Sequence, residues 1–272
     1  MLPRDRSALA GITIDDLPAM KGRSEKFASI TAYDFSFAKL VDSAGIEMVL
    51  IGDSLGNVIQ GRNTTIPVSV DEMAYHTESV RRGVEHSLVV SDMPFMSYAT
   101  PTDALHNAAI LMQAGAQMVK LEGGEWLGDT IYQLTERGIP VCAHLGLTPQ
   151  SVYKIGGFKV QGRDPKAAEK IVADALLLQE AGAQLLVIEC VPSSLGKLLA
   201  QTLNIPVIGI GAGPDTDAQI LVLYDMLGIS PAFPRFSKNF LSDSGSVLIA
   251  LQQYAEQVRG GAFPAPKHCF SE

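Results

Sequence analysis

The sequence predicts a single (β/α)8 barrel with a short N-terminal extension, on three observations. The chain has 272 residues, which suits one barrel of about 250 residues plus extensions. Short apolar runs alternate with helical patterns from about residue 29 to residue 261. Six of these runs end in an acidic or histidine side chain, namely Asp34, Asp53, Asp92, Glu122, His144 and Glu189. Because the ends of barrel strands meet on the face that carries the active site, we expect these side chains to form a ring.

The expected elements follow one another along the chain in strand–helix order. The expected strands are residues 29–34, 48–53, 88–92, 118–122, 140–144, 185–189 and 206–210, with a weaker eighth at 226–229. The expected helices are residues 35–44, 70–83, 101–114, 126–137, 165–181, 194–203, 216–227 and 247–259. Helix starts are indicated by Thr100-Pro101, Asp164-Pro165 and Asp215-Thr216. An open doubly wound sheet is the alternative, and it would spread the six side chains along one edge.

This pattern suggests three segments of very different size. We expect an N-terminal arm or helix over residues 1–25, a catalytic barrel over 26–261 and a C-terminal tail over 262–272. The first segment has no apolar stretch like that of a secretory signal, and its acidic residues disfavour a transit peptide. Residues 147–163 form an unusually long connection with Gly156-Gly157, which predicts a lid or binding loop, the alternative being a disordered insertion.

The composition excludes several classes of partner. The net charge of −8 argues against nucleic acid, and no apolar run reaches the ~20 residues that span a bilayer. Charged residues make up only 18%, below the usual share of about 25%, so we expect part of the surface to be buried in a homo-oligomer. Three irregularly spaced cysteines, Cys142, Cys190 and Cys269, do not form a disulfide framework and favour a reducing compartment.

The acids at the ends of neighbouring strands predict a metal site. Asp53 and Asp92 end the second and third strands, so their carboxylates can approach each other closely. Oxygen ligands of this kind suit Mg²⁺, which is commonly held by one or two carboxylates together with water and substrate oxygens. Glu122, on the fourth strand, can complete the site directly or through water. The alternative is that these acids cap helices or pair with arginine.

Three further side chains are candidates for binding and proton transfer. Lys120 shares a strand face with Glu122, where it can hold a substrate carboxylate or an enolate oxygen, or form a structural ion pair. A Schiff-base role for this lysine is less needed beside a metal. Glu189 lies across the ring from the metal acids and is the candidate acid/base. His144 can orient substrate or Glu189, or be a core histidine.

Other polar and glycine positions leave more than one interpretation open. Ser54 can bind a carboxylate or carbonyl oxygen, or be a turn residue. Tyr33 and Asp34 can line the floor of the site or cap the first barrel helix. The glycines of residues 209–213 suggest either an anion-binding loop or close backbone packing.

Several of these segments, taken together, resemble the ketopantoate hydroxymethyltransferase family over about residues 26–261. The matching segments are Thr31-Ala32-Tyr33-Asp34, Gly52-Asp53-Ser54-Leu55-Gly56, Ala74-Tyr75-His76-Thr77, Val80-Arg81-Arg82-Gly83, Asp92-Met93-Pro94-Phe95, Val119-Lys120-Leu121-Glu122-Gly123-Gly124, His144-Leu145-Gly146-Leu147-Thr148-Pro149-Gln150, Glu189-Cys190-Val191-Pro192 and Ile208-Gly209-Ile210-Gly211-Ala212-Gly213. Residues 226–238 are looser, so the eighth strand is the least well defined.

The resemblance implies a barrel of the phosphoenolpyruvate/pyruvate-binding type and a cytoplasmic enzyme of pantothenate synthesis that forms a decamer of pentameric rings. The implied reaction moves a hydroxymethyl group from 5,10-methylenetetrahydrofolate to 3-methyl-2-oxobutanoate through a Mg²⁺-stabilised enolate, giving 2-dehydropantoate. The implied site has Mg²⁺ on Asp53, Asp92 and Glu122, substrate on Asp53, Ser54, Asp92 and Lys120, and Glu189 as proton acceptor. His144 is a further candidate substrate contact.

Two alternatives to this function remain open at the level of the sequence. One is another Mg²⁺ barrel of the same superfamily that cleaves or rearranges a 2-oxoacid without folate. The other is a non-catalytic barrel that serves as an oligomeric scaffold. The sequence contains no folate-binding motif, so it does not place the folate pocket.

Overall fold

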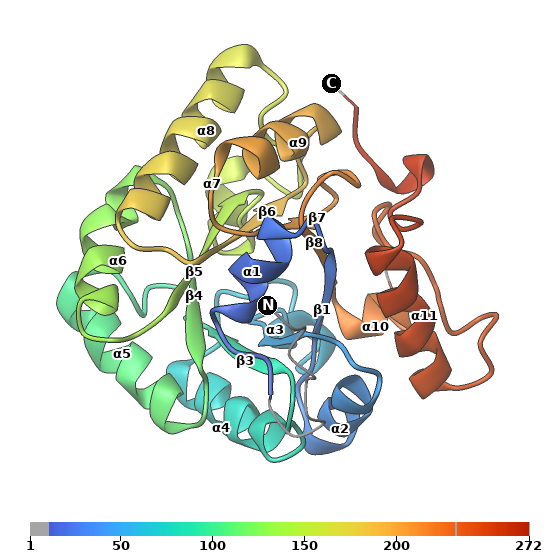
Figure 1. Cartoon of the computed structure of the whole chain (residues 1–272). Coiled ribbons are helices and arrows are strands. Elements are labelled where there is room, and N and C mark those ends of the chain that lie inside the picture. Colours follow the sequence, from blue (N-terminus) through green and yellow to red (C-terminus); the bar gives the residue numbers. More distant parts are fainter. Residues whose placement is uncertain (1–10, 232, 272) are drawn as a thin grey trace, which may run out of the picture.

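The computed structural model describes residues 11–231 and 233–271, and it contains a closed barrel of eight parallel strands in chain order (Figure 1). The strands are β1 (Phe27–Thr31), β2 (Met48–Ile51), β3 (Leu88–Asp92), β4 (Met118–Glu122), β5 (Val141–Gly146), β6 (Leu185–Glu189), β7 (Val207–Ile210) and β8 (Ala218–Leu221). Each strand pairs with the next, and β8 pairs with β1 to close the sheet. The barrel prediction is confirmed, and an open sheet is excluded.

Helices surround this barrel and connect its strands. The α-helices are α1 (Asp16–Gly22), α2 (Phe35–Ser43), α3 (Leu55–Val58), α4 (Val70–Arg81), α5 (Pro101–Gln113), α6 (Gly128–Thr135), α7 (Val152–Ile155), α8 (Pro165–Glu180), α9 (Ser193–Thr202), α10 (Leu223–Met226) and α11 (Val247–Arg259). Short 3₁₀ helices are η1 (Glu125–Leu127), η2 (Pro149–Ser151) and η3 (Pro266–His268). None of the helices in the described residues is long and apolar enough to cross a membrane.

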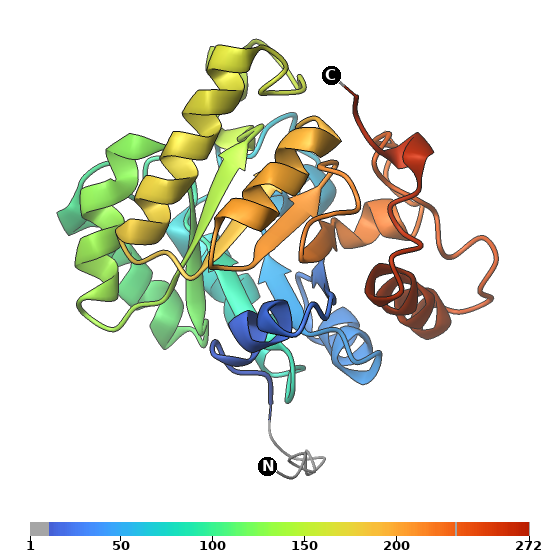
Figure 2. The same ribbon diagram turned by 45° about the horizontal axis from the view of Figure 1, so that its top comes forward.

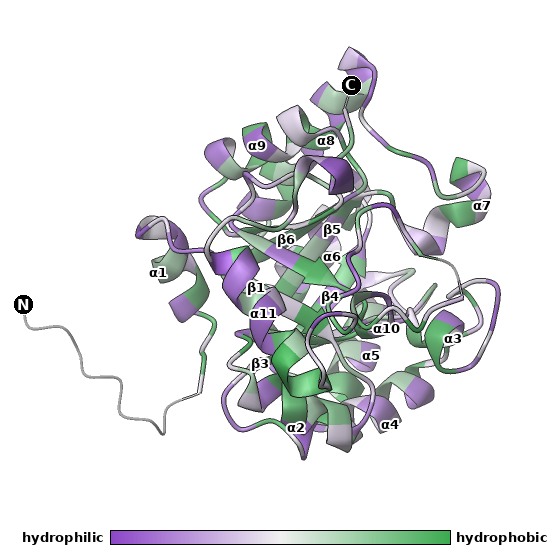
Figure 3. Ribbon diagram, turned by 90° about the vertical axis from the view of Figure 1, so that its right-hand side faces the viewer, coloured by the Kyte–Doolittle hydropathy of each residue, from purple (hydrophilic) through white to green (hydrophobic). Residues whose placement is uncertain are grey.

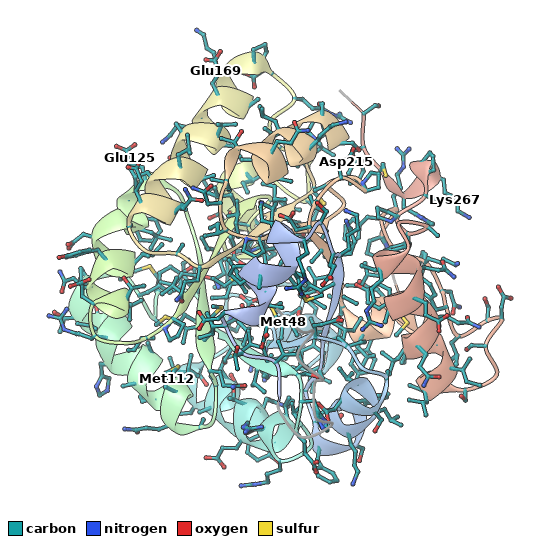
Figure 4. The ribbon with its side chains drawn as sticks, viewed as in Figure 1. Met48, Met112, Glu125, Glu169, Asp215 and Lys267 are labelled. Atoms are coloured by element: carbon teal, nitrogen blue, oxygen red, sulfur yellow. The ribbon has the colours of Figure 1, made fainter. Side chains whose placement is uncertain are left out.

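The two ends of the barrel differ in what closes them. At the amino end of the strands, α1 lies across the opening and buries Leu17 and Met20 against the interior side chains (Figures 2 and 3). Met48, labelled at the centre of Figure 4, belongs to this interior cluster. The short helices α3 and α7 lie at the opposite, carboxyl end (Figure 3). The apolar plug at one end leaves the carboxyl end for polar chemistry.

Five of the eleven α-helices in the described residues begin at a side chain that caps them. Thr100 and Asp164 accept backbone hydrogen bonds from the first turns of α5 and α8, and proline follows each of them. Asp34 does the same for α2, so of its two possible roles it takes that of a helix cap. These side chains satisfy amide groups that have no partner within the helix.

The predictions for the eighth strand and the preceding helix are wrong. Residues 218–221, inside the expected helix 216–227, form β8, and residues 223–226 form the short helix α10. The expected strand at 226–229 contains the end of α10 followed by a turn at Gly228. The helix-like spacing of apolar residues is overridden because β8 finds partners on both sides, β7 and β1, and completes the barrel.

The C-terminal residues pack against the barrel. Tyr254 on α11 donates a hydrogen bond of 2.8 Å to the Ser29 carbonyl oxygen of β1. Phe263, beyond α11, is buried and packs edge-on against Tyr254 and Phe240. The first residues of the expected tail, 262–272, are therefore packed against the rest of the protein.

Candidate active site

The interior positions of four neighbouring strands change from apolar to polar towards the carboxyl end. On β3 the series is Leu88, Val90 and Asp92, on β4 it is Met118, Lys120 and Glu122, on β5 it is Cys142 and His144, and on β6 it is Leu185, Val187 and Glu189. Because side chains alternate across a strand, these residues share the inner face. The alternation that directs apolar side chains into the barrel core therefore also directs the polar side chains at these four strand ends into the carboxyl end of the barrel.

The structure brings together six of the predicted site residues at this point, which we call the polar cluster: Asp53, Asp92, Lys120, Glu122, His144 and Glu189. Lys120 lies at its centre. The Nζ atom of Lys120 is 2.9 Å from Oδ1 of Asp92 and 3.5 Å from Oε1 of Glu122. Burial lowers the pKa of Lys120, but these carboxylates and Asp53 outweigh burial and raise it. The surrounding carboxylates therefore favour the charged form of the lysine.

His144 connects the two glutamates of the cluster. Its Nδ1 atom is 3.2 Å from Oε1 of Glu122, and its Nε2 atom is 3.3 Å from Oε2 of Glu189. Burial and the nearby Lys120 lower the pKa of His144, while Glu122 and Glu189 raise it, and the balance raises the pKa to about 9. Since a carboxylate only accepts, and each ring nitrogen faces one, the raised pKa favours the form with a proton on both nitrogens. The 3.2 Å approach of Nδ1 to the Lys120 ammonium is then a contact between two donors.

The negative charge of the cluster is unevenly compensated. Burial raises the pKa of Glu122, but Lys120 and His144 outweigh burial and lower it. Burial, with repulsion from Glu122 and Asp92, raises the pKa of Asp53 to about 8. Burial also raises the pKa of Asp92. Three carboxylates surround one lysine, so their negative charge is not fully compensated. The raised pKa values of Asp53 and Asp92 indicate that the excess negative charge lies at these two residues.

Gln150 and Tyr98 are buried members of this site that the sequence analysis assigned no role. Gln150, on η2 of the long connection, donates from Nε2 to Oδ2 of Asp53 at 2.9 Å. Its backbone N–H donates to Oε2 of Glu122 at 3.0 Å. Tyr98 donates its hydroxyl to Oε1 of Gln150 and to the Glu122 carbonyl oxygen. Gln150 lies in the segment that resembled the family, which is the one signal that pointed to it.

Ser54 lies at the edge of the polar cluster and bonds to a residue from the connection that follows β1. Its Oγ atom is 2.8 Å from the hydroxyl of Tyr33, which is buried. A Cβ atom at Gly52 would lie 2.7 Å from Oγ of Ser54, so the glycine makes room for the hydroxyl. Ser54 is thus held in place beside Asp53.

The glycines of residues 209–213 are explained by close packing. A Cβ atom at Gly209 would lie 2.6 Å from Oγ1 of Thr216. At Gly213, where φ is +87°, a Cβ atom would lie 2.6 Å from Cβ of Ser193. The neighbouring chain therefore occupies the space that side chains would need.

The donor atoms of the polar cluster fit a hard divalent cation. Within residues 11–231 and 233–271, no three Asp, Glu, His or Cys side chains are already arranged to hold an ion by themselves. Both oxygens of Glu122 accept hydrogen bonds from protein groups. Oδ1 of Asp53 has no partner among the described residues. All-oxygen donors with excess negative charge suit Mg²⁺, which needs only one or two carboxylates plus water or substrate.

Comparison with solved structures supports the fold. A phosphonomutase-like protein from Burkholderia cenocepacia J2315 is 16% identical, with a TM-score of 0.62 over 79% of this chain and 95% of that chain. Phosphonopyruvate hydrolase, solved as a complex with oxalate and Mg²⁺, is 14% identical, with a TM-score of 0.60 over 94% of this chain and 93% of that chain. At these sequence identities, the likeness concerns only the fold, namely the barrel and the helices that surround it.

Sequence comparison is far more specific. The family model described as "Ketopantoate hydroxymethyltransferase" matches residues 11–266. The chain is 58% identical to the 3-methyl-2-oxobutanoate hydroxymethyltransferase of Shewanella halifaxensis, covering 97% of this chain and 100% of that protein. It is 59% identical to the enzyme of the same name from Alteromonas mediterranea, covering 95% and 98%. With its polar cluster at the carboxyl end of a closed barrel, the chain belongs to the ketopantoate hydroxymethyltransferase family.

Proposed function

We propose that this hydroxymethyltransferase converts 3-methyl-2-oxobutanoate, 5,10-methylenetetrahydrofolate and water into 2-dehydropantoate and tetrahydrofolate. The observation that carries the proposal is the buried lysine among three carboxylates, with a histidine–glutamate pair beside it. Such a site can bind a small anion, stabilise new negative charge on oxygen and accept a proton. The names of the relatives that are 58% and 59% identical supply the substrate.

The metal ligands in this proposal are Asp53 and Asp92, with Glu122 acting through water. The free Oδ1 atom of Asp53 supports its part, and the occupied oxygens of Glu122 support the indirect role. The Mg²⁺ in the phosphonopyruvate hydrolase complex supports the choice of ion, although that protein shares only the fold. When bound, Mg²⁺ would supply Lewis acidity that makes the C3 proton of the ketoacid easier to remove.

The ketoacid is held by Lys120 and Ser54 in this proposal. Its carboxylate and carbonyl oxygens resemble the adjacent oxygens of oxalate, the ligand of that distant hydrolase. Lys120 is charged and buried, so its interaction with an enolate oxygen is weakly screened by solvent. The hydroxyl of Ser54, held by Tyr33, can donate to a second oxygen.

Glu189 is the proposed base that removes the C3 proton. Its side chain is 13% exposed, compared with 2% for Glu122, so it is the more accessible of the two glutamates. His144, 3.3 Å away, orients the carboxylate of Glu189 and acts as a positioning residue. The enolate carbon then bonds to the one-carbon unit, and both C–N bonds that join this unit to the folate break. Water supplies the hydroxyl oxygen, and its two protons and the C3 proton end on that hydroxyl and on the two folate nitrogens, which leaves tetrahydrofolate.

Proton NMR in D₂O with 3-methyl-2-oxobutanoate and methylenetetrahydrofolate, with and without Mg²⁺, tests this function. We expect Mg²⁺-dependent loss of the C3–H signal and new hydroxymethyl resonances. Exchange of the C3 proton without a hydroxymethyl product would favour the folate-free 2-oxoacid barrel. No Mg²⁺-dependent binding of the ketoacid to folded protein would favour the non-catalytic scaffold.

We also infer that the enzyme forms a homo-oligomer in the cytoplasm, with the decamer that the family resemblance implies. Large aromatic side chains such as Tyr75 and Phe158 are 69% and 67% exposed, which supports burial by other subunits. All three cysteines are free thiols, which supports a reducing compartment. Light scattering that gave a monomer mass would contradict the oligomer.

A further inference from the structure

A cleft of about 640 Å³ opens beside the polar cluster, between the connections that follow β4 and β5 and the side of α8. Its volume lies within the range of small-molecule sites, roughly 300–1,000 Å³. Two glycines that line the cleft lie next to residues of the polar cluster. Gly123 directly follows Glu122, and Gly146 lies two positions after His144. Glu125, also in the lining, is labelled near α6 and α8 in Figure 4. The cleft thus adjoins the proposed ketoacid site but is not needed to hold the ketoacid.

One wall of this cleft is an exposed tryptophan whose ring packs against that of a buried tyrosine. Trp126 is 60% exposed, yet its ring stacks on that of Tyr98 with centroids 6.0 Å apart and planes at 12°. Gly123 has φ of +151°, and a Cβ atom there would lie 2.7 Å from the indole ring. The glycine therefore leaves room for Trp126. A large flat ring that is both solvent-facing and fixed is a stacking platform for another planar ring.

The platform is connected to the metal-binding acids. Tyr98, beneath Trp126, donates to Oε1 of Gln150, and Gln150 in turn donates to Oδ2 of Asp53. Tyr98 also donates to the carbonyl oxygen of Glu122 at 3.2 Å. A ring stacked on Trp126 would consequently lie at a fixed position relative to the carboxylates of the polar cluster.

The cleft also holds one unpaired cation among the side chains that line it. Lys170 is paired with Asp174 at 2.7 Å and with Glu125 at 3.1 Å. Lys154, on α7, lines the same cleft and forms no ion pair with any residue that the structure describes. Its ammonium group is available to an anionic ligand. The cleft therefore combines a face for a planar ring with a positive charge for a carboxylate.

We propose that this cleft binds the one-carbon donor, with its heteroaromatic ring on Trp126 and its carboxylate tail at Lys154. The inference rests on the proposed function, which requires a reduced folate, a molecule with a flat pterin ring at one end and glutamate carboxylates at the other. A donor in this cleft reaches the polar cluster from the side of Glu122 and His144. The ketoacid remains on Lys120 and Ser54.

Because Trp126 is the only tryptophan in the chain, its fluorescence reports on the cleft directly. We would titrate the full-length protein with 5-formyltetrahydrofolate, a stable reduced folate, and expect saturable quenching. By calorimetry, Trp126→Ala should weaken binding of this probe about tenfold or more, as expected for loss of ring stacking, and Trp126→Phe should restore most of the affinity. Tyr153→Ala, which removes an exposed aromatic outside the cleft lining, is the matched control and should bind normally.

The variant Lys154→Ala tests the contact of the carboxylate tail separately from that of the ring. It should weaken binding of 5-formyltetrahydrofolate several-fold but leave the affinity for 6-methyltetrahydropterin, which has no carboxylate tail, unchanged. Equal loss for both probes, or loss for neither, would contradict the assigned orientation.

The cleft assignment and the proposed reaction can fail separately. If wild-type protein makes the hydroxymethyl product while Trp126→Ala keeps the wild-type KM for methylenetetrahydrofolate, the cleft assignment is wrong and the reaction stands. If wild-type protein exchanges the C3 proton but makes no hydroxymethyl product and binds no folate probe, the proposed function fails, and this inference fails with it.

Discussion

The side-chain amide of Gln150 donates a hydrogen bond of 2.9 Å to Oδ2 of Asp53, although the two residues lie 97 positions apart in the chain. The same residue binds Glu122 through its backbone N–H. One buried glutamine therefore sets the positions of two carboxylates that repel each other. Outer partners of this kind orient metal ligands and tune their affinity.

Replacing Gln150 by Ala should weaken Mg²⁺ binding by about tenfold or more, the usual effect of losing an outer-shell partner. The reason is that Asp53 loses the donor that fixes its carboxylate. Calorimetric titration with Mg²⁺ would measure this. Gln133→Ala is a matched control, because Gln133 donates a similar bond to Asp129 on the exposed side of α6. Equal Mg²⁺ affinity in all three proteins would show that Gln150 does not position the acids.

Replacing Glu189 by Gln should lower turnover roughly 10²- to 10⁴-fold, the usual contribution of a general base. Ketoacid binding should change much less, because the proposed substrate contacts are Lys120 and the proposed metal ligands, not Glu189. Steady-state kinetics and calorimetry with 3-methyl-2-oxobutanoate would measure the two effects. Glu256→Gln, on the exposed face of α11, is the control for loss of a carboxylate. Weaker binding with unchanged turnover of bound substrate would contradict the role of Glu189.

Replacing Lys120 by Met should lower the free energy of unfolding by about 3–5 kcal/mol at pH 7, as for removal of one member of a buried ion pair. Asp92 and Glu122 would lose the ammonium that compensates their negative charge. The loss should be smaller at pH 5, because carboxylates whose pKa is raised take up protons there. Urea unfolding at both pH values would measure it.

The control for this variant is Lys166→Met, on the exposed surface of α8, which should change stability little at either pH. An equal loss for Lys120→Met at pH 5 and pH 7 would mean that the lysine supports the fold by packing and not by neutralising the acids.

Most of the fold and much of the polar cluster follow from local sequence patterns. Asp92, Glu122 and Glu189 each end an apolar run, so finding the strand also finds the acid. Lys120 follows from its two-residue spacing to Glu122 on the same strand. The physical reason is that the carboxyl ends of all strands in a parallel barrel meet on one face, so the position of a residue along its strand determines where it lies in the barrel.

What the sequence did not predict depends on contacts between distant segments. Residues 218–221 become β8 because they pair with β1, about 190 positions earlier in the chain, while their local spacing favours a helix. Gln150 and Tyr98 lie outside the strands, and their roles arise from the conformation of the connections that follow β3 and β5. No periodicity in the sequence reports such loop conformations.

Replacing Asp42 by Asn should destabilise the protein at neutral pH but not in acid. Oδ1 of Asp42 accepts hydrogen bonds from the backbone N–H groups of His86 and Ser87, at 2.9 and 2.8 Å, which ties α2 to the start of β3. Burial raises the pKa of Asp42, but the bonds from His86 and Ser87 outweigh burial and lower it below the ordinary value.

Because this pKa is lower in the folded protein, the carboxylate stabilises the fold above the unfolded-state pKa of about 3.9, and the stabilisation is lost as the pH falls through the folded-state pKa. We expect a loss of about 1–3 kcal/mol at pH 6, as for weakened buried hydrogen bonds, that shrinks as the pH falls from about 4 towards 3. Urea unfolding of wild type, Asp42→Asn and the exposed control Asp243→Asn would test this. A difference that stayed constant from pH 6 to pH 3 would show that the charge of Asp42 contributes nothing, and that only the shape of its side chain matters.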